Sequence, residues 1–96
     1  MQDGIFAQQK FYNKSELKTA IRTDLIGELE AIDQYNAHIN ATDNQLARAV
    51  WTDIMNEEKT HVGELLTLLH TLDPTELQKL KEGQQEVEEI MRELGI

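Results

Sequence analysis

The 96-residue sequence has no cysteine, one proline and few aromatic residues. Without cysteine, the chain offers no disulfide and no thiolate for zinc, for an iron–sulfur cluster or for nucleophilic catalysis. It also lacks a run of about 18 apolar residues, so we expect no transmembrane helix. The first residues lack the charged and apolar regions of a secretory signal, which makes a cytoplasmic protein the expectation.

Basic residues are also scarce, with 9 Lys and Arg against 18 Asp and Glu and a net charge of −9. Such a surface is a poor partner for nucleic acid. It enriches cations nearby, although acidic excess is too common to indicate a metal site by itself. A chain of this length is one small domain with a modest core, so we expect oligomerisation.

The apolar pattern predicts an all-α fold with three helices and no strand. We place the helices at about 15–40, 43–71 and 74–94, within a unit of residues 14–96 that follows a loose segment at 1–13. Each predicted start has capping residues. These are Asn13 or Ser15 for the first helix, Thr42 with Gln45 for the second, and Asp73 with Pro74 and Glu76 for the third.

The short turn at 40–43 predicts that the first two helices form an antiparallel hairpin. Each helix has a seam of mainly apolar residues at alternating spacings of three and four, the pattern by which helices pack together. The first seam is Ile21, Leu25, Glu28, Ile32, Tyr35 and Ile39. The second is Ala47, Trp51, Ile54, Glu58, His61, Leu65, Leu68 and Leu72.

Three ionisable residues interrupt these seams: Glu28, and the Glu-x-x-His pair Glu58 and His61. In the predicted hairpin, Glu28 faces a position within one turn of Glu58, so all three lie at one level. A buried carboxylate is costly unless it is paired, hydrogen-bonded or bound to a metal. A metal site is therefore the simplest explanation for the group.

Ferritin-like di-iron bundles use one Glu from each of two helices and Glu-x-x-His from each of the other two. This chain supplies half of that set, and a twofold dimer would supply the rest and complete a four-helix bundle. Carboxylate and imidazole ligands without thiolate suit iron, manganese or zinc. We expect two iron ions per dimer, bridged by Glu58, with Glu28 and His61 as terminal ligands, and oxidation of Fe(II) by dioxygen or peroxide.

Other interpretations remain open at this point. Glu-x-x-His is short enough to occur by chance, and the acids could share a proton or set the helix register, as a buried Asn does. The main alternative is a non-catalytic helical dimerisation module that binds structural zinc or calcium. A rubrerythrin-type peroxidase is a third possibility, although its usual rubredoxin-like partner would need cysteine.

The remaining candidates have simpler explanations. His38 lies off the seam, and His70 is placed to interact with the dipole at a helix C-terminus. Trp51 and Tyr35 fit the core, although Tyr35 could also hydrogen-bond a metal ligand. Glu30 lies on a solvated face and is the best candidate among the surface acids for passing iron inward.

The chain resembles the encapsulated ferritins, short ferritin-like proteins that supply half a bundle per chain. The resemblance covers most of residues 20–80 and includes the thirty-residue separation of Glu28 and Glu58. The matching stretches are Gly27–Asn36 (GELEAIDQYN), Asn56–His61 (NEEKTH), Leu65-Leu66 and Asp73-Pro74.

The resemblance implies a ferroxidase centre at a twofold interface, with Glu28, Glu58 and His61 from both chains. It further implies that dimers form a ring-shaped decamer, partly through the third helix, and that this ring works inside an encapsulin shell that stores the oxidised iron. Glu30 matches one of two acids that attract metal ions on the family's outer face.

Three features depart from the family pattern. Gly27 stands where the second metal-attracting acid is usual, and Gln34 replaces a commonly aromatic position beside Tyr35. Family members usually carry a tail with a shell-targeting peptide, whereas this sequence ends at Leu94-Gly95-Ile96 without an evident linker. We expect the first two changes to affect iron access.

Overall fold

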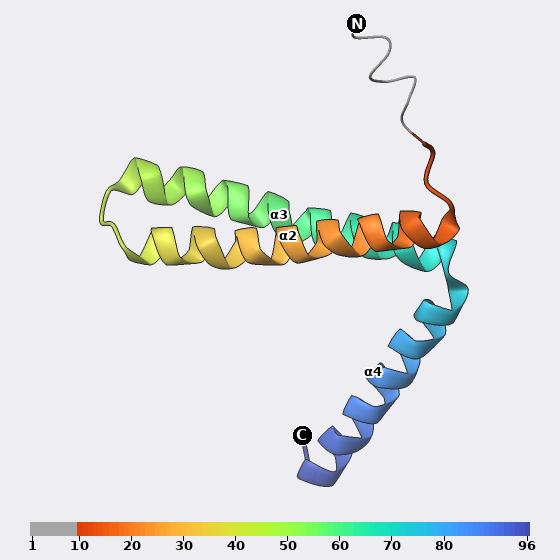
Figure 1. Cartoon of the computed structure of the whole chain (residues 1–96). Coiled ribbons are helices and arrows are strands. Elements are labelled where there is room, and N and C mark those ends of the chain that lie inside the picture. Colours follow the sequence, from red (N-terminus) through yellow and green to blue (C-terminus); the bar gives the residue numbers. More distant parts are fainter. Residues whose placement is uncertain (1–9) are drawn as a thin grey trace, which may run out of the picture.

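The computed structural model describes residues 10–96 and contains three helices in this range, with no strand. They are α2 (Lys14–Asn40), α3 (Gln45–Leu72) and α4 (Pro74–Leu94). Helices α2 and α3 lie side by side and antiparallel, and α4 leaves the end of the hairpin opposite the turn (Figure 1). The predicted all-α class is confirmed. Residues 1–9 of the predicted N-terminal segment lie outside the described residues.

Two capping predictions have different outcomes. Asn13 caps α2 through a capping box, in which its side chain accepts from the Glu16 amide at 2.8 Å and the Glu16 carboxylate accepts from the Asn13 amide at 3.0 Å. The capping box expected from Thr42 and Gln45 is wrong. Asn44 caps α3 instead, because its side-chain oxygen accepts from the Ala47 amide at 2.9 Å, and the helix begins at Gln45.

The third helix begins as its sequence predicts. The Asp73 side chain accepts hydrogen bonds from the backbone amides of Thr75 and Glu76, and Pro74 occupies the first turn. Proline is favoured there because that turn needs no amide donor from it. The helix ends at Leu94 and is followed by Gly95, whose positive φ of 73° is a conformation that favours glycine.

The hairpin buries little by itself. Among the described hydrophobic residues, only Ile21, Ile39 and Leu69 are buried. The molecule measures 62 × 44 × 14 Å, and its radius of gyration of 19.0 Å exceeds the value of about 12.5 Å expected for a compact domain of this length. Two helices cannot enclose a core, so the apolar seams stay half-covered.

Helix α4 packs against α3 near their junction and then runs free of the hairpin (Figure 1). Its apolar side chains are exposed beyond the first turns, including those of Leu80, Val87, Ile90 and Leu94. Within residues 10–96, no helix combines the length and the apolar character needed to cross a membrane.

Candidate metal centre

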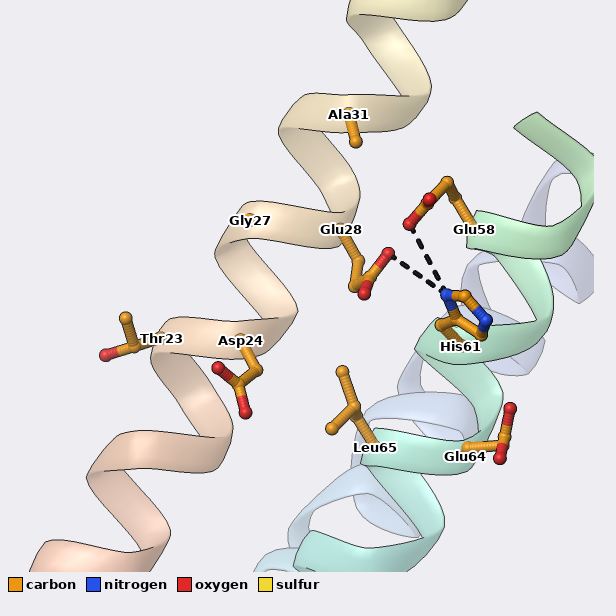
Figure 2. A pocket seen from close by; sticks show the side chains of 9 residues that line it. All are labelled: Thr23, Asp24, Gly27, Glu28, Ala31, Glu58, His61, Glu64 and Leu65. Atoms are coloured by element: carbon orange, nitrogen blue, oxygen red, sulfur yellow. Dashed lines mark ion pairs between the residues drawn. The ribbon is translucent and has the colours of Figure 1, made fainter. Parts of the chain in front are cut away.

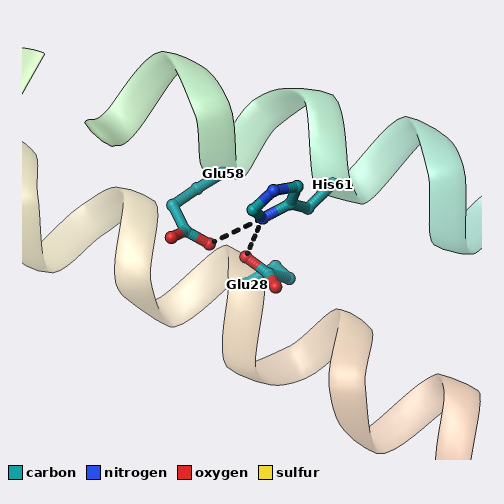
Figure 3. Close-up of side chains that lie close together, drawn as sticks. All are labelled: Glu28, Glu58 and His61. Atoms are coloured by element: carbon teal, nitrogen blue, oxygen red, sulfur yellow. Dashed lines mark ion pairs between the residues drawn. The ribbon is translucent and has the colours of Figure 1, made fainter. Parts of the chain in front are cut away.

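The structure brings the three predicted ligands together at the middle of the hairpin. Glu28 projects from α2 toward α3, and Glu58 and His61 project back from successive turns of α3 (Figure 3). Residues three apart on a helix share one face, so Glu58 and His61 point the same way. The antiparallel packing of the seams places Glu28 at their level.

The ligand atoms are close enough to hold one ion. His61 Nδ1 lies 3.5 Å from an oxygen of Glu28 and 3.5 Å from an oxygen of Glu58. One ligand atom from each residue can be chosen so that all three lie within 4.8 Å of one another. Two atoms 3.5 Å apart can both lie at about 2.1 Å from one metal ion, which is a usual length for nitrogen and oxygen ligands.

The protein alone does not satisfy this cluster. Glu28 Oε2 is buried and has no hydrogen-bond partner, and its 3.5 Å approach to His61 is too long for a strong hydrogen bond. Buried polar atoms normally have partners. A cation between the carboxylates and the imidazole would provide the missing interaction, so the residues present fit a metal ion.

The cluster lines an open cavity of about 580 Å³ (Figure 2). About half of the His61 side chain is exposed, whereas Glu28 and Glu58 are more covered. One side of the ligand group therefore faces out of the hairpin. Besides the three ligands, the cavity is lined by Thr23, Asp24, Gly27 and Ala31 of α2 and by Glu64 and Leu65 of α3.

Sequence reasoning missed two acidic residues in this lining. Asp24 lies one turn before Glu28 on α2, and Glu64 lies one turn after His61 on α3 (Figure 2). Their spacing from Glu28 and His61 could have predicted this position, because residues three or four apart share a helix face. Both side chains are exposed and lie off the two seams, so their position beside the ligands was not predicted.

The other predicted residues lie elsewhere. Glu30 is exposed on α2, and it is not among the residues within 10–96 that line the cavity. Tyr35 contacts His38 edge-to-face at 6.5 Å between ring centroids, and His38 in turn contacts Trp51 at 5.1 Å. A hydrogen bond from Tyr35 to a metal ligand stays a prediction.

Comparison with known proteins gives relatives of one kind, although no family model matches the chain. The chain is 39% identical over 83 residues to a ferritin-like–encapsulin shell fusion protein of Pyrococcus furiosus. It is 41% identical over 69 residues to the encapsulin nanocompartment cargo protein EncC of Myxococcus xanthus. These matches cover 86% and 72% of this chain but only 24% and 53% of the respective relatives.

A solved structure decides the family. The crystal structure of the encapsulated ferritin domain from Pyrococcus furiosus matches with a TM-score of 0.85 and 38% identity, covering 93% of this chain and 88% of that one. The chain belongs to the encapsulated ferritins. This encapsulated ferritin corresponds to nearly the whole of that domain but to about a quarter of the fusion protein. The resemblance recognised in the sequence is confirmed.

Proposed function

We propose that this encapsulated ferritin oxidises Fe(II) to Fe(III) at a di-iron centre shared between two copies of the chain. The observation that carries the proposal is the group formed by Glu28, Glu58 and His61, whose ligand atoms lie within 4.8 Å at an open cavity. The family supports a ferritin-like role in iron chemistry.

A second copy is needed because one chain provides too few ligands and too few helices. Three side chains cannot fill the coordination of two metal ions, whereas a twofold pair provides four glutamates and two histidines, the complement of a ferritin-like di-iron site. The exposed side of His61 and the thin 14 Å profile of the molecule support a partner on this face.

The two glutamates and the histidine have separate roles in this arrangement. In the proposed dimer, Glu58 of each chain would be a ligand shared by the iron pair, and Glu28 and His61 would each hold one iron. When bound, the iron pair supplies two electrons, which together with two protons reduce dioxygen to hydrogen peroxide or hydrogen peroxide to two waters. The carboxylates stabilise the added positive charge of Fe(III), because hard oxygen ligands favour the harder ion.

The names of the relatives extend the proposal to assembly and location. The Myxococcus xanthus relative is an encapsulin nanocompartment cargo protein, and the Pyrococcus furiosus relative is a ferritin-like–encapsulin shell fusion protein. We propose that dimers of this chain assemble into a ring, a decamer by family resemblance, and that the ring acts inside an encapsulin nanocompartment in the cytoplasm. Iron oxidised there would be stored by the shell.

Ferrous oxidation tests the proposal directly. Fe(II) is added aerobically to the parent chain and to Glu58→Ala and His61→Ala variants, and ferric absorbance is followed over time. We expect the parent to exceed the buffer rate and both variants to fall to it. Glu57→Ala is the matched control, because it removes an exposed carboxylate one residue from Glu58 and should retain the parent rate.

The same experiment separates catalysis from structural metal binding. If the Glu58 and His61 variants oxidise iron as fast as the parent, the catalytic proposal is wrong. If zinc raises the thermal stability of the parent while iron oxidation stays at the buffer rate, the cluster is a structural metal site in a dimerisation module.

A further inference from the structure

The junction between α3 and α4 is tied to α2 by two ion pairs. Lys18 Nζ lies 3.0 Å from Oδ2 of Asp73, the residue between the two helices. One turn further along α2, Arg22 pairs with Glu76 in the first turn of α4. We refer to Lys18–Asp73 and Arg22–Glu76 as the junction ion pairs.

Little else fixes the direction of α4 within the described residues. Apart from the Arg22–Glu76 pair, α4 packs only against α3. From Gln78 to the end of the chain, every residue is exposed except Glu82, which is partly covered. The junction is therefore the place where the orientation of the whole helix is decided.

A small change at this junction is amplified along the helix. Helix α4 has 21 residues, which corresponds to a length of about 31 Å. A rotation of about 20° at its first turn would displace its far end by about 10 Å, given that length. Single surface ion pairs stabilise folds weakly. They can still select among orientations of α4 that otherwise differ little in contacts.

Asp73 links this junction to the helix start itself. One carboxylate oxygen accepts from the backbone amides of Thr75 and Glu76, while the other accepts from Lys18. The residue that caps α4 is thus also the residue held by α2. Helix capping and helix direction are coupled through a single side chain.

We propose that the junction ion pairs are an orienting device, in which Lys18 and Arg22 of α2 set the angle at which α4 leaves the hairpin. They thereby fix where the exposed apolar face of α4 is presented. The proposal does not depend on iron oxidation, because none of the four residues lines the metal cavity.

Spin-label distances can measure this angle, and the absence of native cysteine makes labelling specific. Labels are attached to Asn56→Cys on α3 and Glu88→Cys on α4, both exposed positions. Labelled chain is diluted with unlabelled chain so that only distances within one copy are recorded. Arg22→Glu places a second negative charge beside Glu76. Lys18→Met removes the positive charge that pairs with Asp73.

We expect a narrow distance distribution for the parent and about twice that width for each variant, because the angle loses its electrostatic restraint. Salt at 1 M should broaden the parent distribution as well, because high salt weakens ion pairs near the protein surface. The double variant Arg22→Glu/Glu76→Arg should recover the parent distribution by reversing the pair.

Lys79→Met is the matched control, because Lys79 pairs with Glu82 within α4 and not with the hairpin. It should leave the distribution unchanged. The proposal is overturned if Arg22→Glu and Lys18→Met match the parent, or if the charge reversal fails to restore it. Circular dichroism identifies a variant that has lost helix, and the salt response of the parent then decides the question.

Discussion

Glu28 shows most directly how this hairpin differs from an ordinary helical pair. Its Oε2 atom is buried without a hydrogen-bond partner, although apolar residues precede and follow it along the same seam. Such an atom costs stability in the metal-free chain because its hydration is lost without replacement. The chain therefore gives up stability at a position where a metal ion would restore it.

The variant Glu28→Gln tests whether this carboxylate lowers the stability of the metal-free chain and binds the metal. We expect the metal-free variant to be at least as stable as the parent, because a neutral amide costs less to bury than a carboxylate. Zinc serves as a redox-inert probe. At 100 times the dissociation constant it should stabilise the parent by about 2.7 kcal/mol. For a domain of this size, that corresponds to a rise in melting temperature of about 10 °C or more.

The variant should lose this zinc-induced rise, as measured by thermal melts followed by circular dichroism. Glu64→Gln is the control, because it neutralises a carboxylate in the lining of the same cavity that is not one of the three ligands. A variant that keeps the full zinc response would exclude Glu28 as a ligand.

At the scale of elements, local chemistry predicted most helix starts. Asn13 and Asp73 cap their helices as expected because their side chains satisfy amides a few residues away. The prediction that Thr42 caps the second helix is wrong because Asn44, two residues later, is the cap. The Thr42 hydroxyl instead accepts a hydrogen bond from the Asn44 amide at 3.2 Å, and Asn44 caps α3. Competition between neighbouring caps depends on the path of the turn, which spacing alone does not specify.

Asp73 gives a pH prediction for the junction. Hydrogen bonding by Thr75, followed by that of Lys18, lowers the pKa of this carboxyl from 3.8 to about 2. Because the folded pKa is the lower one, the stabilisation is complete above pH 4 and is lost as the pH falls toward 2.

Asp73→Asn keeps a capping side chain but removes the charge. Urea denaturation between pH 5 and 2.5 should show a shallower loss of stability in this variant. If the stability of the parent and of Asp73→Asn falls equally with pH, the lowered pKa of Asp73 does not contribute to stability.

Gly83 gives a second prediction at this scale. It lies inside α4, and a Cβ added there would meet no atom within 4 Å. Gly83→Ala should therefore stabilise α4 by about 1 kcal/mol through helix propensity. Amide hydrogen exchange within α4 should slow by about fivefold. Gly63→Ala is the control, because it makes the same open-space change in α3 and should leave exchange in α4 unaltered. An unchanged rate in Gly83→Ala would contradict the predicted stabilisation of α4.

At the scale of the whole molecule, the sequence predicted the hairpin and the level at which Glu28, Glu58 and His61 meet. Both follow from seam spacing and a short turn. The direction of α4 was not predictable, because it depends on ion pairs between Lys18 or Arg22 and residues more than fifty positions away. The extended shape, with a radius of gyration of 19.0 Å, fits the proposal that other copies of the chain complete the core.

Ala31 provides a test of the shared site that leaves every proposed ligand in place. It lines the metal cavity on α2, so Ala31→Arg would put a large charged side chain where the second copy must approach. Ala37→Arg is the matched control, because Ala37 is exposed and lies about 180° around the helix from Glu28, whereas Ala31 lies about 60° from it, at 100° per residue. If two copies build one centre, we expect metal to increase the mass of the parent in analytical ultracentrifugation. Ala31→Arg should show no such increase and should oxidise Fe(II) at the buffer rate. Ala37→Arg should keep both the increase in mass and the parent rate. Full oxidation by an Ala31→Arg monomer would show that one chain suffices.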